Sequence, residues 1–409
     1  MWLTLKKHNV SIVIYLLWLA AVFDPIGDMY MLRYIALAST VLCILFLGSF
    51  RQLISREVNL KKLAILYISF FMPIYGIILC VIRGGLGPEF LDTSYVAAGI
   101  LLLLSLIYVN EYFAGVGLRA MIFSLRCLVF LIIVVYVVIL TDLNKDWISF
   151  FTERQVALVS VREYSGITLP YIYFLASPML IYIIGYDLNK IFVNFNFKNA
   201  IICFSSLFAF AISGTRSHMI LAVAYAPLFY LLVFSKHKLL LILFYITVVV
   251  GVLTIYDVEI LRAFFSANET SNSMKIELLN NYAEIFNSPF TFFFGQGYNA
   301  HTWSVTLRKM IAVDEHASKT ELTYIEIVRV YGLVVAIPFY FILTTLVSRL
   351  ARKSGEFRWL YPALLIYLLN SSLNPYLFST NGMLPLGLII AIVTFKRVSP
   401  HPYLAKTGQ

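Results

Sequence analysis

The sequence predicts an all-α integral membrane protein with about 12 transmembrane helices, within a range of about 10–12, and one large loop on the outer side of the membrane. Of the 409 residues, 61% are hydrophobic and only 13% are charged, whereas a soluble domain carries about 25% charged residues. Apolar windows recur along the whole chain, and one long polar interval, residues 257–322, interrupts them. Little sequence is left for a soluble domain, so we expect residues 1–409 to form a single polytopic membrane domain.

The expected helices follow the apolar windows of the sequence. These windows lie near residues 10–23, 31–50, 63–82, 95–109, 120–141, 170–186, 200–213, 219–234, 239–256, 323–348, 359–373 and 382–395. Several are shorter than the ~17 residues that a span usually needs, so either their helices extend into the flanks or one pair is re-entrant. The first window continues directly into the second, so we expect an uncleaved first helix rather than a signal peptide.

The basic residues indicate the orientation of the chain. With the N-terminus inside, most of the 31 lysines and arginines fall in the inner connections, and the short outer connections hold few of them. The positive-inside rule then places both termini in the cytoplasm and makes residues 142–169 and 257–322 two outer loops. The net charge of +10 is therefore mostly a topology signal, and we expect the lipid bilayer as a partner and no nucleic acid.

The smaller outer loop, residues 142–169, mixes aromatic and charged side chains, among them Arg162. Trp147, Phe150 and Phe151 stand close together in it. Such a mixture is typical of helices that lie at a membrane interface. We expect this loop to form an interfacial helix or a cap over a cavity.

A short polar turn, Ser213 to His218, joins two expected helices on the outer side. The turn is too short for Arg216 to reach far into solvent, so its guanidinium is expected at headgroup depth, where a lipid-linked phosphate lies. A guanidinium fork binds phosphate oxygens through paired charge-assisted hydrogen bonds. The alternative is an arginine that merely snorkels at a helix end, although the neighbouring Gly, Thr and Ser residues add donors that a plain helix end does not need.

The large loop leads into the membrane through the sequence ELTYIEIVRVYG, Glu321 to Gly332. Glu326 and Arg329 are spaced so that they can pair on one face of a helix. Ionisable residues inside a membrane usually face a cavity or a partner, so this pair would either serve a site or lock helix packing. Glu321 comes earlier, at the interface, where partial burial would raise its pKa towards that of a general base. Its alternative is a glutamate that stabilises a helix N-terminus.

A third polar stretch, Gly295 to His301, is a Gly-rich turn in which Tyr298 stands beside Asn and Gln residues. Aromatic faces next to hydrogen-bonding groups suit a sugar ring, although His301 and His316 have the alternative of being ordinary surface histidines. The sequence holds no DxD, HExxH, Walker A or GxSxG motif. We therefore expect no metal, no cofactor and no serine hydrolase.

These features together resemble the bacterial O-antigen polymerase (Wzy-type) family, within the O-antigen polymerase and ligase group. The resemblance rests on the general layout of the whole chain and on three short stretches: SGTRS at 213–217, FGQGY at 294–298, and Glu321 to Gly332. It implies a GT-C-like fold and a glycosyltransferase of the bacterial inner membrane. Such an enzyme acts at the periplasmic face on oligosaccharides linked to undecaprenyl pyrophosphate.

The resemblance also implies roles for individual residues. Arg216 matches the outer-turn arginine that the family uses near the lipid pyrophosphate, and Glu321 stands where a ligase has histidine, eleven positions before Gly332. That departure favours a polymerase over a ligase and makes His316 the other candidate base. We expect Arg216 and Glu321 to be catalytic. The expected substrate-binding residues are Arg162, Tyr298, His301, Arg308, Lys309, His316, Tyr324 and Arg329.

The chemistry that the resemblance implies needs few parts. A pyrophosphate is a good leaving group, so the enzyme needs cations to stabilise it, a base near the acceptor hydroxyl, and exact positioning. We expect transfer of a growing glycan from its lipid carrier onto a new lipid-linked repeat unit, with a chain-length regulator and a flippase as candidate protein partners. The alternatives are an O-antigen ligase and, from another class, a transporter that flips the same lipid-linked oligosaccharide.

Overall fold

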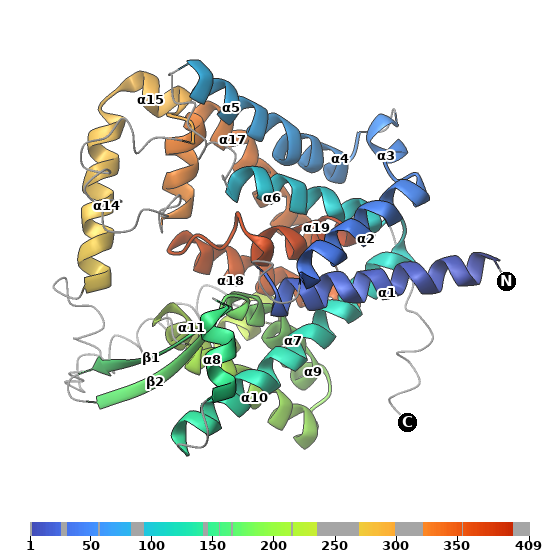
Figure 1. The fold of residues 1–409 in the computed structure, drawn as a ribbon, viewed down its shortest axis with the longest axis vertical. Coiled ribbons are helices and arrows are strands. Elements are labelled where there is room, and N and C mark those ends of the chain that lie inside the picture. Colours follow the sequence, from blue (N-terminus) through green and yellow to red (C-terminus); the bar gives the residue numbers. More distant parts are fainter. Residues whose placement is uncertain are drawn as a thin grey trace.

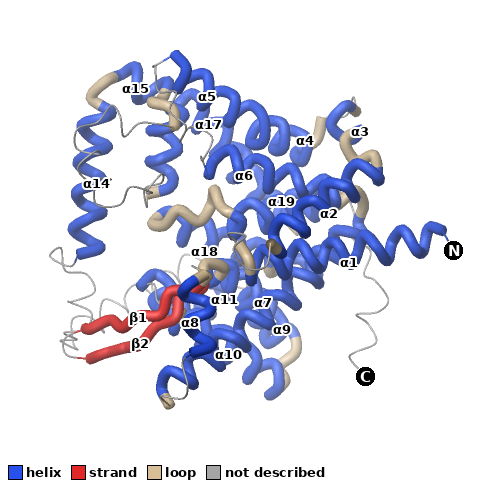
Figure 2. Tube along the Cα trace, in the orientation of Figure 1, coloured by secondary structure: helices blue, strands red, loops and turns tan. Residues whose placement is uncertain are grey.

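In the computed structural model, the chain folds into a bundle of helices with one β-hairpin (Figures 1 and 2). The structure describes residues 2–25, 31–55, 58–82, 94–141, 146–154, 156–164, 167–213, 216–234, 270–298, 322–353 and 355–395. The expected helix at 239–256 and most of the expected large loop, residues 257–322, lie outside the described residues.

The first half of the chain is almost entirely helical. Its helices are α1 (Trp2–Phe23), α2 (Leu32–Leu47), α3 (Arg51–Ile54), α4 (Leu60–Ile65), α5 (Met72–Ile82), α6 (Ser94–Leu103), α7 (Glu111–Leu140) and α8 (Asp146–Glu153). A π-helical turn, η1 (Leu66–Phe71), joins α4 to α5 without a break, and a 3-10 turn, η3 (Leu104–Ile107), extends α6.

The second half begins with the hairpin and then returns to helices. The strands are β1 (Ala157–Tyr164) and β2 (Ile167–Phe174). The helices are α9 (Leu180–Val193), α10 (Phe197–Ile212), α11 (Arg216–Val233), α14 (Thr270–Phe286), α15 (Pro289–Phe294), α17 (Thr323–Ala351), α18 (Leu360–Ser372) and α19 (Thr380–Thr394), with short 3-10 turns η4 (Ser177–Met179) and η6 (Gly355–Phe357).

Four helical stretches are long and apolar enough to cross a membrane: Leu60–Ile82, Glu111–Leu140, Arg216–Val233 and Thr323–Ala351. Six further apolar helices in the described part of the chain are shorter. The helical architecture is confirmed, and the length and apolar character of these helices agree with the expected membrane protein. The count of about 12 spans and the GT-C-like fold stay predictions.

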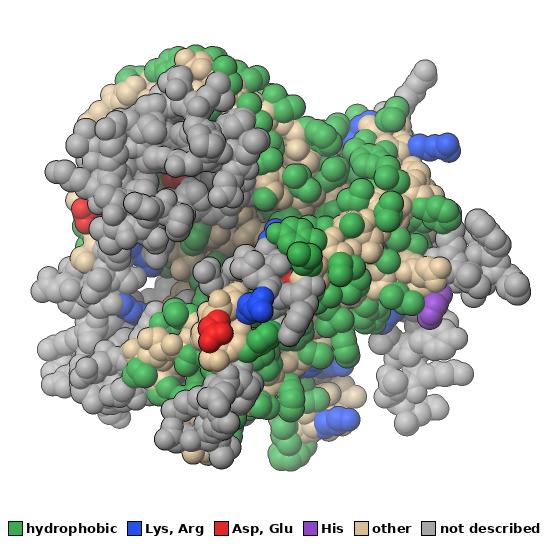
Figure 3. Space-filling model, viewed as in Figure 1, with side chains coloured by type: hydrophobic (Ala, Val, Ile, Leu, Met, Phe, Trp, Pro, Cys, Tyr) green, Lys and Arg blue, Asp and Glu red, His purple; other side chains and the backbone are tan. Residues whose placement is uncertain are grey.

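The outer surface of the bundle is apolar. Hydrophobic side chains cover most of the described surface on the face drawn in Figure 3, and large side chains such as Leu42, Phe130 and Phe204 are 65%, 71% and 69% exposed. A soluble monomer rarely exposes contiguous apolar patches of this kind. A lipid bilayer is the environment that covers such a surface.

The hairpin corrects the expectation for residues 142–170. The short helix α8 agrees with the expected interfacial helix, but the residues after it form two antiparallel strands that pair Ala157 with Phe174 and Arg162 with Leu169. The expected span at 170–186 is therefore wrong in its first part, because residues 170–174 belong to β2 and α9 begins only at Leu180. Both strands contain several β-branched or aromatic residues, which favour strands.

Helix α17 is broken near its start. Gly332 has φ 74° and ψ 163°, which is not helical, and this conformation is one that glycine adopts readily. The hydroxyl of Tyr340 donates a hydrogen bond to the backbone oxygen of Tyr324 at 2.6 Å, whereas sixteen residues of straight helix would span about 24 Å. The first part of α17, Thr323–Tyr331, thus lies at a sharp angle to the longer part that follows.

The loop elements gather at one end of the bundle. In Figure 1, α14, α15 and the hairpin lie on the left, while α1 begins on the far right. One large core of buried residues runs through the bundle. A small separate cluster of Leu278, Tyr282 and Leu322 joins α14 to the residue that precedes α17.

Candidate functional site

The turn before α11 is organised around a buried histidine. His218 is fully buried and stacks on the ring of Phe210, with 4.3 Å between the ring centroids. The Ser213 hydroxyl donates to the Phe210 carbonyl at 2.6 Å and lies 2.8 Å from Nδ1 of His218. The Ser213 hydroxyl and Nδ1 of His218 therefore share a hydrogen bond in the buried turn. The sequence analysis did not single out this histidine.

Arg216 is the first residue of α11, and its side chain is half-buried. A positive charge is unfavourable at a helix N-terminus, where the helix dipole favours anions. Helix stability therefore does not explain the arginine. Arg216 lies close in sequence to the buried His218, at the first residue of α11, which fits its expected position at the end of a span. The expected contact between Arg216 and phosphate stays a prediction.

The beginning of α17 docks on α18 and on the turn that follows it. The Thr323 hydroxyl donates to the Asn374 carbonyl at 2.8 Å, and the Tyr324 hydroxyl donates to the Leu368 carbonyl at 2.8 Å. These bonds fix the residues directly after Glu321, which itself lies outside the described residues.

The turn between α18 and α19 also contacts the beginning of α11. The ring of Tyr376 lies 6.2 Å from that of His218, and its side chain shares a hydrogen bond with Tyr173 of β2. Burial raises the pKa of Tyr173 to about 12, and the hydrogen bond to Tyr376 opposes this only in part, so Tyr173 is protonated at neutral pH. The Asn381 side chain donates to the Leu175 carbonyl. Thus α11 and α17, far apart in the sequence, meet on one turn.

No role was predicted for this turn from the sequence. The stretch NSSLNPYLFSTN, Asn370 to Asn381, is uncharged but rich in hydrogen-bonding side chains, and it lies between two apolar windows. Asn370, Ser371, Tyr376 and Asn381 are nevertheless buried. A run of Asn, Ser and Thr between two spans is the signal that would have identified it, because buried polar groups need partners.

The FGQGY stretch crosses the break in α17. The amide of Gln296 donates to the Arg329 carbonyl at 2.7 Å, and the amide of Gly297 donates to the Val330 carbonyl at 2.9 Å. Gly295 has φ 84°, and a Cβ there would lie 2.5 Å from the backbone nitrogen of Gly332. The two glycines therefore allow two backbones to touch at a place where no other residue fits. The FGQGY stretch and the polar stretch that ends at Gly332, both predicted from the sequence, are thereby brought together.

The expected pair of Glu326 and Arg329 is confirmed. Their side chains are only 2% and 3% exposed, and they form a two-point ion pair in which Nε of Arg329 lies 2.6 Å from Oε2 of Glu326. The Tyr282 hydroxyl of α14 donates to the same carboxylate at 2.8 Å. The Gln296 side-chain oxygen accepts from Arg329 at 3.5 Å. The pair therefore ties α17 to both α14 and the FGQGY stretch.

Tyr298 is turned into the protein rather than towards solvent. It is 6% exposed, and its hydroxyl lies 3.3 Å from the Pro73 carbonyl and 3.2 Å from the Tyr331 hydroxyl. The backbone amide of Tyr298 contacts the sulfur of Cys80 at 3.1 Å. Its expected contact with a sugar is untested, and its visible contacts hold the FGQGY stretch against α5.

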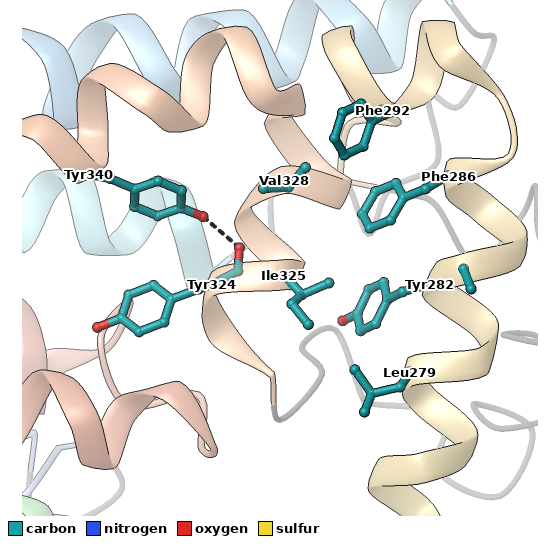
Figure 4. A pocket seen from close by; sticks show the side chains of 9 residues that line it. Leu279, Tyr282, Phe286, Phe292, Tyr324, Ile325, Val328 and Tyr340 are labelled. Carbon is teal, nitrogen blue, oxygen red and sulfur yellow. Dashed lines mark hydrogen bonds between the residues drawn. The ribbon is translucent and has the colours of Figure 1, made fainter.

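An aromatic pocket of about 440 Å³ opens beside the ion pair, between α14, α15 and α17. Figure 4 shows the rings of Tyr282, Phe286 and Phe292 on one side, facing Ile325 and Val328 of α17. The lining is completed by Leu279, Ala283, Tyr324 and Tyr340. Tyr324, expected to bind substrate, is thus part of the wall of this pocket, and that wall is almost wholly apolar.

The other expected site residues lie outside the described part of the structure, either wholly or in their side chains. Glu321, His301, Arg308, Lys309 and His316 lie outside the described residues. The backbone of Arg162 pairs with Leu169 in the hairpin, but its side chain is outside the described part of the structure.

A second ion pair, which is partly buried, was also not predicted from the sequence. Arg126 of α7 forms a two-point pair with Asp187 of α9, and one of these bonds is 2.7 Å long. The Ser206 hydroxyl of α10 donates to Asp187 at 2.8 Å and accepts from Arg126 at 3.0 Å. The spacing of these three residues in the sequence gives no hint that they meet.

Within the described ranges, no group of three or more His, Cys, Asp or Glu side chains is placed to hold a metal ion. No family model matches the chain, and no curated protein matches it in sequence.

Proposed function

We propose that the protein is a membrane glycosyltransferase that polymerises lipid-linked oligosaccharide repeat units, as an O-antigen or related surface polysaccharide polymerase does. The observation that carries the proposal is the meeting of α11, which begins at Arg216, and α17, which follows Glu321, on the single turn between α18 and α19. The turn thereby brings the first residue of α11, Arg216, and the first residue of α17, Thr323, which follows the candidate base Glu321 by two positions, to one end of the bundle.

In this proposal, Arg216 binds the pyrophosphate of the lipid carrier. A half-buried guanidinium at the end of a span is partly screened from water, which strengthens its attraction to a dianionic leaving group. As the glycosidic bond to the carrier breaks, charge develops on the departing phosphate oxygen, and Arg216 stabilises it. The acceptor hydroxyl loses its proton to Glu321 or His316 as it attacks the anomeric carbon.

Arg329 acts as a positioning residue in the same proposal. Its charge is already matched by Glu326, and its guanidinium also reaches Gln296, so a second anion would have to displace an existing partner. The ion pair instead holds the two stretches that flank residues 299–321. Arg308 and Lys309, inside that interval, are the further cations proposed for the substrate phosphates.

The aromatic pocket supports a lipid-linked substrate. Its lining by Tyr282, Phe286, Phe292 and Tyr324 is apolar and open to one side, as a site for part of a polyprenyl chain would be. Burying one methylene group of such a chain contributes about 0.8 kcal/mol, so a few isoprene units would hold the carrier in place while the sugars react.

The proposal is tested with purified protein in lipid nanodiscs and a lipid-linked repeat unit as the sole substrate. Wild-type protein is expected to form a ladder of longer lipid-linked glycans. Arg216→Ala should lower the rate by about 10²-fold. One of Glu321→Ala and His316→Ala, whichever removes the base, should abolish elongation, whereas Arg352→Ala, a change of an exposed arginine after α17, should leave the rate unchanged. Normal elongation by folded Arg216→Ala, or by both folded Glu321→Ala and His316→Ala, would refute the assigned roles.

A further inference from the structure

The short helix α15 has one face against the protein and one face that is uncovered. Thr291 is 5% exposed, and Phe292 lines the aromatic pocket. On the other face, Phe290, Phe293 and Phe294 are 59%, 46% and 43% exposed. Three large rings on six residues form an apolar patch that water does not cover favourably.

This patch continues the lipid-facing side of α5. Phe71, Ile74 and Ile78 are 48%, 52% and 49% exposed at helical spacing along the span that ends with α5. The ring of Tyr75 stacks on Phe71 within the same stripe, and its hydroxyl donates to the Phe294 carbonyl at 2.8 Å. Figure 1 shows α15 beside the end of α5.

The FGQGY stretch lies along α5 and not beyond its end. Its contacts reach from the Cys80 sulfur, bonded to the Tyr298 amide, down to the Pro73 carbonyl, bonded to the Tyr298 hydroxyl. Pro73 precedes the last residue of α5, Ile82, by about 13 Å of helix. One leaflet of the hydrocarbon core is about 15 Å thick. The Tyr298 hydroxyl thus lies nearly one leaflet's thickness along α5 from its end, while the Tyr298 amide, bonded to Cys80, lies close to that end.

The backbone amides of this stretch all have hydrogen-bond partners, as a membrane environment requires. Non-helical backbone is tolerated at membrane depth only where protein groups bond its amides and carbonyls. The amides of Gly295, Gln296, Gly297 and Tyr298 all have partners: the Thr291, Arg329 and Val330 carbonyls and the Cys80 sulfur, respectively. These four amides therefore do not need water as a partner.

We propose that α15 and the residues Gly295–Tyr298 form a re-entrant segment inserted into the membrane leaflet on the side where α5 ends, with lipid hydrocarbon chains covering Phe290, Phe293 and Phe294. This replaces the expectation that residues 257–322 lie wholly outside the membrane. The inference does not depend on the proposed glycosyltransferase activity.

The segment also sets where the following residues begin. Tyr298 is held inside the leaflet, and Leu322, on the far side of residues 299–321, belongs to the small cluster with Tyr282 of α14. Both residues that flank this interval, Tyr298 and Leu322, are therefore held by buried contacts.

The test places a nitroxide spin label at Phe293→Cys and, separately, at Phe290→Cys, in full-length protein in phospholipid nanodiscs. Ile78→Cys on the exposed side of α5 is the lipid reference, and Glu284→Cys on the exposed side of α14 is the water reference. Labelled parent protein gives the background from the native cysteines. Collision rates with oxygen, which concentrates in lipid, and with a water-soluble nickel chelate are measured at each site.

We expect Phe293→Cys and Phe290→Cys to match the oxygen-to-nickel collision ratio of Ile78→Cys and to exceed that of Glu284→Cys. A ratio equal to that of Glu284→Cys would show a water-facing patch and overturn the proposal. Low collision rates with both reagents would show that protein, such as a second copy of the chain, covers the patch, and would overturn it as well. Both positions are exposed, so either variant reports even if the other fails to fold.

Discussion

Two ion pairs, one partly buried and one fully buried, lie in regions of different character. Arg126, Asp187 and Ser206 come from three neighbouring helices of the bundle and fasten them together. Glu326 and Arg329 come from one turn of a single helix, and their other partners come from α14 and from the FGQGY stretch. The first pair stabilises the bundle, while the second determines where loop elements sit on it.

The two pairs also differ in their contact with the surroundings. The Arg126 side chain is 29% exposed, but that of Arg329 is only 3% exposed. An exposed guanidinium that loses its partner can turn to water or a lipid headgroup, whereas a buried one is left with an uncompensated charge. The region around Glu326 should therefore tolerate change much less than the region around Asp187.

The largest expected effect is that of Gly332→Ala. An added Cβ would meet backbone atoms of the 293–295 stretch, and the residue would have to keep a positive φ. We expect a loss of about 4 kcal/mol or more in the free energy of unfolding, or no folded protein at all, measured by denaturant titration in micelles. Gly355→Ala is the matched control, since Gly355 has φ 84° but open space around it, and it should cost about 1 kcal/mol. Equal effects at both sites would show that the crossing of the two backbones is unimportant.

The next effect in size is that of removing one carboxylate. Glu326→Leu should reduce the free energy of unfolding by about 3–5 kcal/mol, because it leaves Arg329 buried and unpaired. The double change Glu326→Leu with Arg329→Met should recover most of that loss, since a buried pair is often replaceable by apolar residues. Asp187→Leu should be milder than Glu326→Leu in the same titration. The reverse order would contradict the difference between the two regions.

The smallest expected effects come from the neutral third partners. Tyr282→Phe removes a hydrogen bond to the Glu326 carboxylate and should cost about 1.5–3 kcal/mol. Ser206→Ala should cost about 1 kcal/mol, because Arg126 stays paired with Asp187 and is partly exposed. In the activity assay, Tyr282→Phe should lower elongation and Ser206→Ala should not, after both are normalised to folded protein. An equal fall in activity would argue that the Glu326 pair has no special link to the site.

Hydropathy predicted the helices well because each apolar window must satisfy its backbone internally in a membrane. The windows at 323–348, 359–373 and 382–395 agree closely with α17, α18 and α19. The hairpin was not predicted because β2 is apolar, so the mean hydropathy of a window near Pro170 looks like the start of a span. The β-branched and aromatic residues of ALVSVREY and ITLPYIYF carry the strand signal.

The site was predictable only in part. The stretches around Arg216, Tyr298 and Arg329 stood out because polar residues are rare in this sequence. That the FGQGY stretch crosses α17 at Gly332 depends on tertiary packing between distant segments, which spacing along the chain does not reveal. The Asn370 to Asn381 turn was overlooked because it carries no charge, although its burial makes it the meeting point of α11 and α17.

The central claim is that this chain lengthens a lipid-linked glycan, and the most direct measurement is the length distribution of surface polysaccharide in a strain that lacks it. Electrophoresis beside the parent strain, and beside the same strain with the chain restored, gives the comparison. The account predicts that the ladder is lost while a single repeat unit remains on the lipid core. Loss of every repeat unit, including the first, would contradict it and would point to a ligase or a flippase.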